Sequence, residues 1–179
     1  MSGDTTQEIQ AFIEGDGHLP RERFERWAQS ENPDILESAI DAVAVANERI
    51  VPPVDELGYF ELLLQALRVS LTRREDASTL SPYLLGGDFL SFLDDAKKHL
   101  GPSGFAQVAS RLERELRGLA HELSPLGKRA LVDGLLEHLL ERDDLRSVFE
   151  PWSAEPGLAP LYLEAEEWAS SVRSSQGSS

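Results

Sequence analysis

The four histidines are the first residues to consider for metal or proton chemistry, since imidazole is a frequent metal ligand and proton carrier. No two of them stand four residues apart on one helix with a glutamate between them, the spacing of a common zinc motif. Asp133, Glu137 and His138 share one predicted helix, but His138 is rotated by about 100° from Glu137, so the three do not converge without a second helix. We therefore predict neither a metal site nor another cofactor. The histidines are His18, His99, His121 and His138.

The residue patterns of common catalytic sites are missing. The chain has no cysteine, which excludes thiolate nucleophiles, thiolate zinc sites and disulfides. No Gly-x-Ser-x-Gly elbow, phosphate loop or dinucleotide fingerprint occurs. Neighbouring carboxylates on a helix point about 100° apart, so such pairs favour solvated faces over acid–base dyads. We therefore predict that the protein is not an enzyme. The carboxylate pairs are Asp94-Asp95, Asp143-Asp144 and Glu166-Glu167.

A short segment near the N-terminus resembles the middle of an EF-hand calcium loop. Glu14 and Asp16 occupy the third and fifth places of such a loop, and Gly17 occupies the sixth. However, Phe12 stands where the first carboxylate belongs, and Arg23 stands where calcium needs a bidentate glutamate. Because arginine does not bind cations, this segment is predicted to be a turn between two helices.

Two clusters could bind a protein partner. Three arginines step by three along one predicted helix, where a phosphate or an acidic peptide could lie. Alternatively, the i,i+4 pairs Arg111–Glu115 and Glu113–Arg117 neutralise most of this positive charge within the helix. We favour this interpretation, in which the arginines stabilise the helix and do not bind a partner. The arginines are Arg111, Arg114 and Arg117.

The second cluster is acidic and surrounds Trp168 on the last predicted helix. An exposed aromatic ring flanked by carboxylates would anchor a basic partner. The favoured alternative is a buried Trp168 that holds the last helix against the core. The carboxylates are Glu155, Glu164, Glu166 and Glu167.

The net charge of −15 limits the kinds of partner. Residues 1–75 contain 15 acidic and 7 basic residues, and residues 151–179 contain 4 and 1. Such a balance repels phosphate backbones and anionic membranes, so we predict no nucleic-acid or membrane partner.

No apolar run approaches the roughly 18 residues of a membrane helix, and the N-terminus lacks the pattern of a secretory signal. A cytoplasmic location is therefore expected. The preference for arginine over lysine favours a bacterial origin.

Hydrophobic periodicity predicts an all-α fold. Apolar residues at spacings of three and four within 52–75 predict a helix at 53–74, buried among its neighbours. Asn32-Pro33 and Ser124-Pro125 are typical helix starts, Gly101-Pro102 is a typical end, and Gly86-Gly87 indicates a turn. No strand pattern occurs. The periodic residues of the central helix are Leu57, Phe60, Leu64, Leu67 and Leu71.

We therefore predict a single domain over 1–173, an orthogonal or antiparallel bundle of about seven or eight helices around a central helix at 53–74. An irregular helical-repeat stack is the alternative, although the uneven helix spacing does not favour it. Residues 174–179 are predicted to be a disordered Ser-rich tail.

The leading functional hypothesis is a non-enzymatic acidic interaction protein that binds a basic or amphipathic protein partner. An adaptor, a dedicated chaperone and a toxin-neutralising immunity protein are examples. The alternative is a small-molecule- or metal-binding helical domain, or an enzyme, with a pocket between helices. A third hypothesis is a regulatory module whose partner fills an exposed apolar groove. The pocket hypothesis would use His121, His138, Tyr59 and Tyr83.

Overall fold

A computed structural model describes residues 5, 7–11, 21–49, 56–72 and 80–176. Within these ranges every regular element is a helix and no strand occurs, which confirms the all-α, bundle-like class. The chain divides into two compact units, Met1–Ser81 and Pro82–Ser179, and each is described by itself. The expected single domain over 1–173 stays a prediction.

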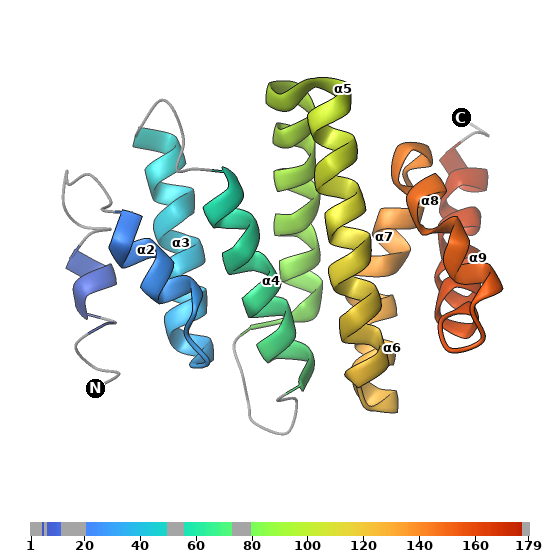
Figure 1. The fold of residues 1–179 in the computed structure, drawn as a ribbon, viewed down its shortest axis with the longest axis horizontal. Coiled ribbons are helices and arrows are strands. Elements are labelled where there is room, and N and C mark those ends of the chain that lie inside the picture. Colours follow the sequence, from blue (N-terminus) through green and yellow to red (C-terminus); the bar gives the residue numbers. More distant parts are fainter. Residues whose placement is uncertain (1–4, 6, 12–20, 50–55, 73–79, 177–179) are drawn as a thin grey trace. The chain divides into compact units, whose positions relative to one another are not determined.

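Figure 1 shows the helices of the first unit packed side by side. The unit contains α2 (Arg21–Ala28), α3 (Pro33–Arg49) and α4 (Glu56–Thr72), and α4 packs against both others. Asn32 caps α3, since its Oδ1 accepts a hydrogen bond from the Asp34 N–H at 3.0 Å. Leu64 is half-buried, and the side chain of Leu57 lies outside the described residues. The buried residues of α4 include Phe60, Leu62, Leu63, Ala66, Leu67 and Leu71.

The second unit is built on α5 (Pro82–Glu122), which the chain folds into two helical halves. Gly101 has φ 66° and ψ −178°, a conformation that residues with a Cβ rarely adopt, and Pro102 then begins the second half. Figure 1 shows the chain reversing direction at this point. The predicted break at Gly101-Pro102 is therefore confirmed.

The remaining elements of the second unit are short helices followed by one longer helix. Ser124 Oγ accepts a hydrogen bond from the Gly127 N–H at 3.2 Å, which confirms the predicted Ser-Pro start. The elements are α6 (Pro125–Leu131), the π-helix η1 (Val132–Leu136), α7 (Glu137–Leu140), α8 (Asp143–Phe149), the 3₁₀-helix η2 (Glu150–Ala154) and α9 (Ala159–Gln176).

The first half of α5 packs on η1 through glycine backbone. A Cβ atom built on Gly86 would lie 1.9 Å from the carbonyl oxygen of Gly134, and one on Gly134 would lie 2.8 Å from the carbonyl carbon of Pro82. Only residues without a Cβ permit so close an approach. The predicted turn at Gly86-Gly87 is therefore wrong, because both glycines lie inside a helix that starts at Pro82.

Helix α9 continues to Gln176, so residues 174–176 are helical where the sequence suggested the start of a tail. The hydroxyl groups of Ser174 and Ser175 donate to helix carbonyls one turn earlier, at 2.9 Å each. Arg173 Nη1 donates to the Leu140 carbonyl oxygen at 2.5 Å and anchors this end of α9 to α7. Residues 177–179 lie outside the described part of the chain.

Candidate functional site

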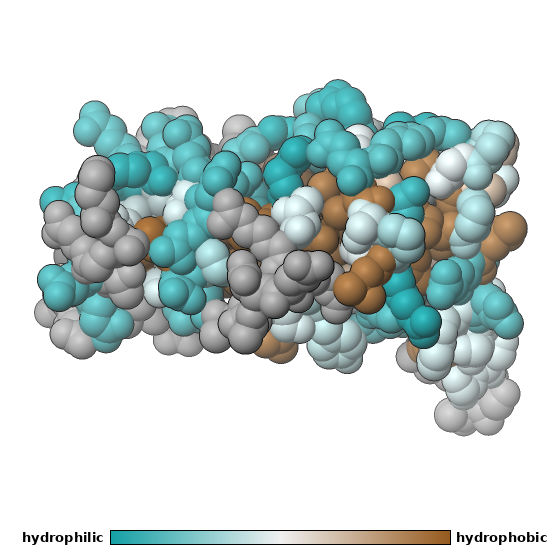
Figure 2. Space-filling view, turned by 90° about the horizontal axis from the view of Figure 1, so that it is seen from below, coloured by the Kyte–Doolittle hydropathy of each residue, from teal (hydrophilic) through white to brown (hydrophobic). Residues whose placement is uncertain are grey.

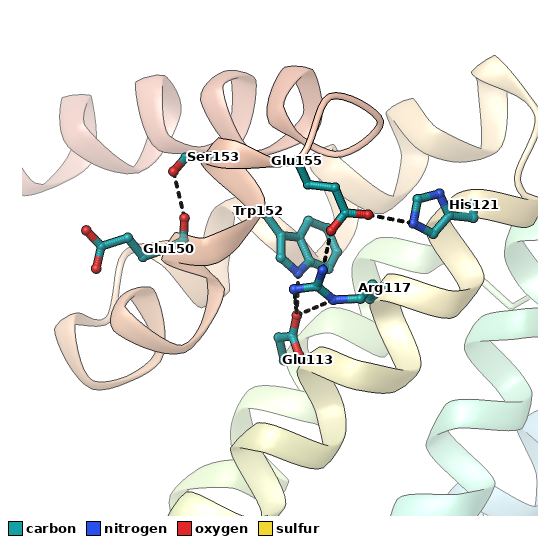
Figure 3. Close-up of polar contacts among 7 residues, drawn as sticks. All are labelled: Glu113, Arg117, His121, Glu150, Trp152, Ser153 and Glu155. Atoms are coloured by element: carbon teal, nitrogen blue, oxygen red, sulfur yellow. Dashed lines mark hydrogen bonds and ion pairs between the residues drawn. The ribbon is translucent and has the colours of Figure 1, made fainter.

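A cluster of charged side chains joins the second half of α5 to η2 (Figure 3). Arg117 donates to Glu113 Oε1 through both Nε, at 2.9 Å, and Nη2, at 2.6 Å. Its Nη1 donates to Glu155 Oε2. The indole N–H of the fully buried Trp152 donates to the same Glu113 oxygen at 2.6 Å. Arg117 and its two carboxylates therefore hold η2 and its buried ring against α5.

His121 completes this cluster. Its Nε2 lies 2.9 Å from Glu155 Oε1, so Glu155 is held between Arg117 and His121. Arg117 and Glu155 belong to the two different clusters that the sequence suggested for partner binding. The structure makes them each other's partners, which leaves neither fully available to a second protein.

The three arginines that step along one helix, Arg111, Arg114 and Arg117, lie in different environments. The predicted i,i+4 ion pair of Glu113 and Arg117 forms, with 2.6 Å between Glu113 Oε1 and Arg117 Nη2. Arg111 is half-buried and has an interaction within the chain. Arg114 is exposed and makes no hydrogen bond or ion pair with any described residue. The three do not form one continuous anion-binding surface.

The glutamates of α9 also lie in different environments. Glu166 points into the unit, where its Oε1 accepts from Arg173 Nη2 at 2.5 Å and from Ser170 Oγ at 3.1 Å. In contrast, Glu164 and Glu167 are exposed and have no hydrogen bond or ion pair among the described residues. Trp168 is 60% exposed, so the alternative of a buried Trp168 is wrong.

The exposed side of α9 is called the α9 face below. Leu163 is 61% exposed and precedes Glu167 by four residues, as Glu164 precedes Trp168. Residues four apart are neighbours on a helix surface, so each apolar side chain lies beside a carboxylate. The α9 face consists of Leu163, Glu164, Glu167 and Trp168.

An open groove of about 660 Å³ lies between the first half of α5 and the α7–α8 junction. Asp144 accepts from Lys97 Nζ at 2.7 Å and from Arg142 Nη2 at 3.2 Å, and Arg142 Nη1 also donates to Asp94 at 2.8 Å. Both cations lie within 6 Å of the centre of the Phe105 ring, at 5.6 and 5.9 Å. The groove is lined by Leu90, Asp94, Lys97, His138, Glu141, Arg142, Asp143 and Asp144.

Asp144 should make the stability of the protein sensitive to acid. Burial raises the pKa of its carboxyl, but hydrogen bonds from Arg142 and Lys97, with their charges, outweigh burial and lower it below 3.8. A lowered folded-state pKa gives stability that is present above pH 3.8 and is lost as the pH falls through the folded-state value. In urea unfolding between about pH 5 and pH 2.5, wild type should lose more stability than Asp144→Asn. Parallel losses would contradict this role.

Within the second unit, the pocket hypothesis named three residues, of which only His138 and Tyr83 contact each other. His121 contacts Glu155. The Nδ1 atom of His138 lies 3.2 Å from Glu141 Oε1, and its ring packs edge-on against the ring of Tyr83 with the ring centres 5.6 Å apart. Tyr59 belongs to the first unit, is half-buried and has an interaction within the chain. Across the described residues no three His, Asp or Glu side chains could hold a metal ion. The segment that resembles a calcium loop lies almost wholly in 12–20, outside the described residues.

No signal in the sequence assigned Trp152 to the cluster between α5 and η2. The ring is buried and its N–H needs an acceptor, but no local spacing relates it to Glu113, which lies 39 residues away. The groove was missed for the same reason, because Asp94 and Arg142 are 48 residues apart. Only the helical pairing of Glu113 with Arg117 had a signal in the sequence.

Within the described residues, no helix has the length and apolar character needed to cross a membrane. Comparison of the chain with protein-family models, with curated proteins and with solved structures gives no match. The functional conclusion therefore depends on the geometry and charge of the chain itself.

Proposed function

We propose that this chain is a non-enzymatic, acidic helical protein that binds a basic or amphipathic protein partner in the bacterial cytoplasm. Adaptors, dedicated chaperones and toxin-neutralising immunity proteins work in this way. The single observation that supports the proposal most is the distribution of ion pairs in the second unit. Its basic side chains are largely held by its own carboxylates, while Glu164 and Glu167 at the surface have no partner among the described residues.

The pairing can be followed residue by residue. Arg117 and Arg142 each contact two carboxylates, and Arg173 contacts Glu166. Glu164 and Glu167 have no such partner within the described part of the chain. With a net charge of −15, the excess negative charge therefore faces solvent, where it attracts a cationic partner over a distance of about one Debye length. Other paired cations are Lys97, Lys98, Arg129 and Arg146.

Salt should weaken partner binding strongly. At about 0.1 M salt the Debye length is roughly 10 Å, and at about 1 M it is roughly 3 Å. Affinity capture with the tagged full chain should therefore recover a basic protein at the lower concentration and on the order of tenfold less of it at the higher one. Quantitative mass spectrometry of the two eluates measures the ratio. Recovery of no specific protein at either concentration, or of one whose yield does not change, would overturn the proposal.

A second candidate function is small-molecule binding in the groove between α5 and α7–α8. The observation in its favour is a volume of about 660 Å³ lined mainly by charged side chains. It ranks below the first because Lys97, Arg142 and Asp144 already bind one another there. A ligand would have to compete with these ion pairs.

A further inference from the structure

We infer that the α9 face is the docking surface, and that its occupant is a basic amphipathic helix of the partner protein. This inference rests on the proposed function and identifies where and how the partner binds. Apolar residues of the partner would pack on Trp168 and Leu163, and its lysines or arginines would pair with Glu164 and Glu167.

Exposed apolar side chains are concentrated in the second unit. All six large apolar side chains that are exposed in the described part of the chain belong to it. On the side that it draws, Figure 2 shows hydrophobic atoms over the second unit, interrupted by hydrophilic atoms. Trp168 differs from the others because tryptophan is the residue most enriched at energetic centres of interfaces. The other five are Tyr83, Leu84, Leu100, Leu126 and Leu163.

The α9 face is held rigidly from behind. Ala165 and Ala169 on the opposite side of α9 are fully buried, and Tyr162 is 8% exposed. The far end is fixed by the hydrogen bond from Arg173 to Leu140. A partner therefore meets a helix whose backbone is already ordered, so binding loses little conformational entropy in this chain.

Charge selects the occupant of this surface. Glu164 and Glu167 are unpaired among the described residues and lie beside the two apolar side chains, so they favour a partner that combines apolar and cationic groups. A second copy of the chain would bring the same glutamates together, which is repulsive. Residues 1–75 are also strongly acidic, with 15 acidic and 7 basic residues, so they do not supply the cationic groups that the surface needs.

A defined peptide can test the inference with the full chain. The probe is a fluorescein-labelled peptide of about 18 leucines and lysines, with leucine at the i, i+3, i+4, i+7 positions of a helix. A peptide of the same composition in scrambled order is its control. Fluorescence anisotropy at about 0.1 M salt measures affinity. The emission of Trp168 should move to shorter wavelength on binding, while Trp27 and Trp152, 1% and 0% exposed, should change little.

Variants locate the binding surface. Trp168→Ala should weaken binding of the amphipathic peptide by about tenfold or more, and Glu164→Gln/Glu167→Gln should weaken it by about tenfold and flatten its salt dependence. Leu84→Ala removes a side chain of similar exposure, 65%, from α5 and should change affinity by less than about twofold. Glu22→Gln/Glu115→Gln removes the same charge from α2 and α5 and should behave like wild type.

The possible outcomes separate the inference from the proposed function. If wild type recovers a basic partner from cells but the α9 variants bind both peptide and partner like wild type, the α9 assignment is wrong while the proposed function stands. If the scrambled peptide binds as tightly as the amphipathic one, the attraction is only electrostatic and the assignment is also wrong. Failure of wild type to bind any cationic peptide or protein at low salt would overturn both.

Discussion

Replacing Gly86 by alanine should lower the free energy of unfolding of the second unit by about 3 kcal/mol. The new Cβ atom would stand 1.9 Å from the carbonyl oxygen of Gly134, which is backbone and has no rotamer that could relieve the clash. The first half of α5 and η1 would have to move apart, and their neighbouring side chains would lose close packing. Urea unfolding followed by far-ultraviolet circular dichroism measures the change.

The next residue in the chain is the matched control. Gly87 lies in the same helix, is exposed, and has nothing within 4 Å of a Cβ built on it. Gly87→Ala should therefore raise stability by about 0.5–1 kcal/mol, because alanine loses less backbone entropy than glycine in a helix. Equal effects of the two substitutions would show that the close contact of Gly86 with Gly134 does not exist in solution.

Removing the Trp152 side chain should destabilise the second unit by about 4 kcal/mol. The ring is 0% exposed and packs edge-on against Phe149 with ring centres 5.4 Å apart. Trp152→Ala would leave a large cavity and would also remove the N–H donor from Glu113. The thermal unfolding midpoint, measured together with urea unfolding, records this loss.

Two further substitutions separate packing from hydrogen bonding. Trp152→Phe keeps an aromatic ring but loses the hydrogen bond to Glu113 and part of the buried ring volume, so a smaller loss of about 2 kcal/mol is expected. Trp168→Ala removes the same residue type from the surface and should change stability by less than about 0.5 kcal/mol. A loss at position 168 as large as that at 152 would contradict the exposed position of Trp168.

Local chemistry in the sequence predicted much of the fold. Asn32 and Ser124 cap helices as expected, because their side chains accept hydrogen bonds from the N–H groups of the first turn. Gly101-Pro102 breaks α5, because glycine tolerates a positive φ and proline starts a new helix. These signals depend on residues within one helical turn, which is why the sequence alone reveals them.

Features that depend on distant residues were not predictable. Gly86 and Gly87 have the composition of a turn, but both lie inside a helix, where the small size of Gly86 permits the contact with Gly134, 48 residues later. Arg117 and Glu155 are 38 residues apart, and their pairing removed one residue from each predicted partner-binding cluster. Whether Trp168 is exposed depends on which side of α9 packs against the rest of the unit. The sequence was compatible with an exposed and with a buried Trp168.

Each compact unit contains one fully enclosed indole ring, Trp27 in the first and Trp152 in the second. With Trp168 replaced by phenylalanine, the chain keeps both buried rings, and each of them reports on the unfolding of its own unit. The cooperativity of the whole molecule then becomes directly measurable. One shared denaturation midpoint means a single folding unit, whereas two distinct midpoints mean that residues 1–81 and 82–179 fold independently.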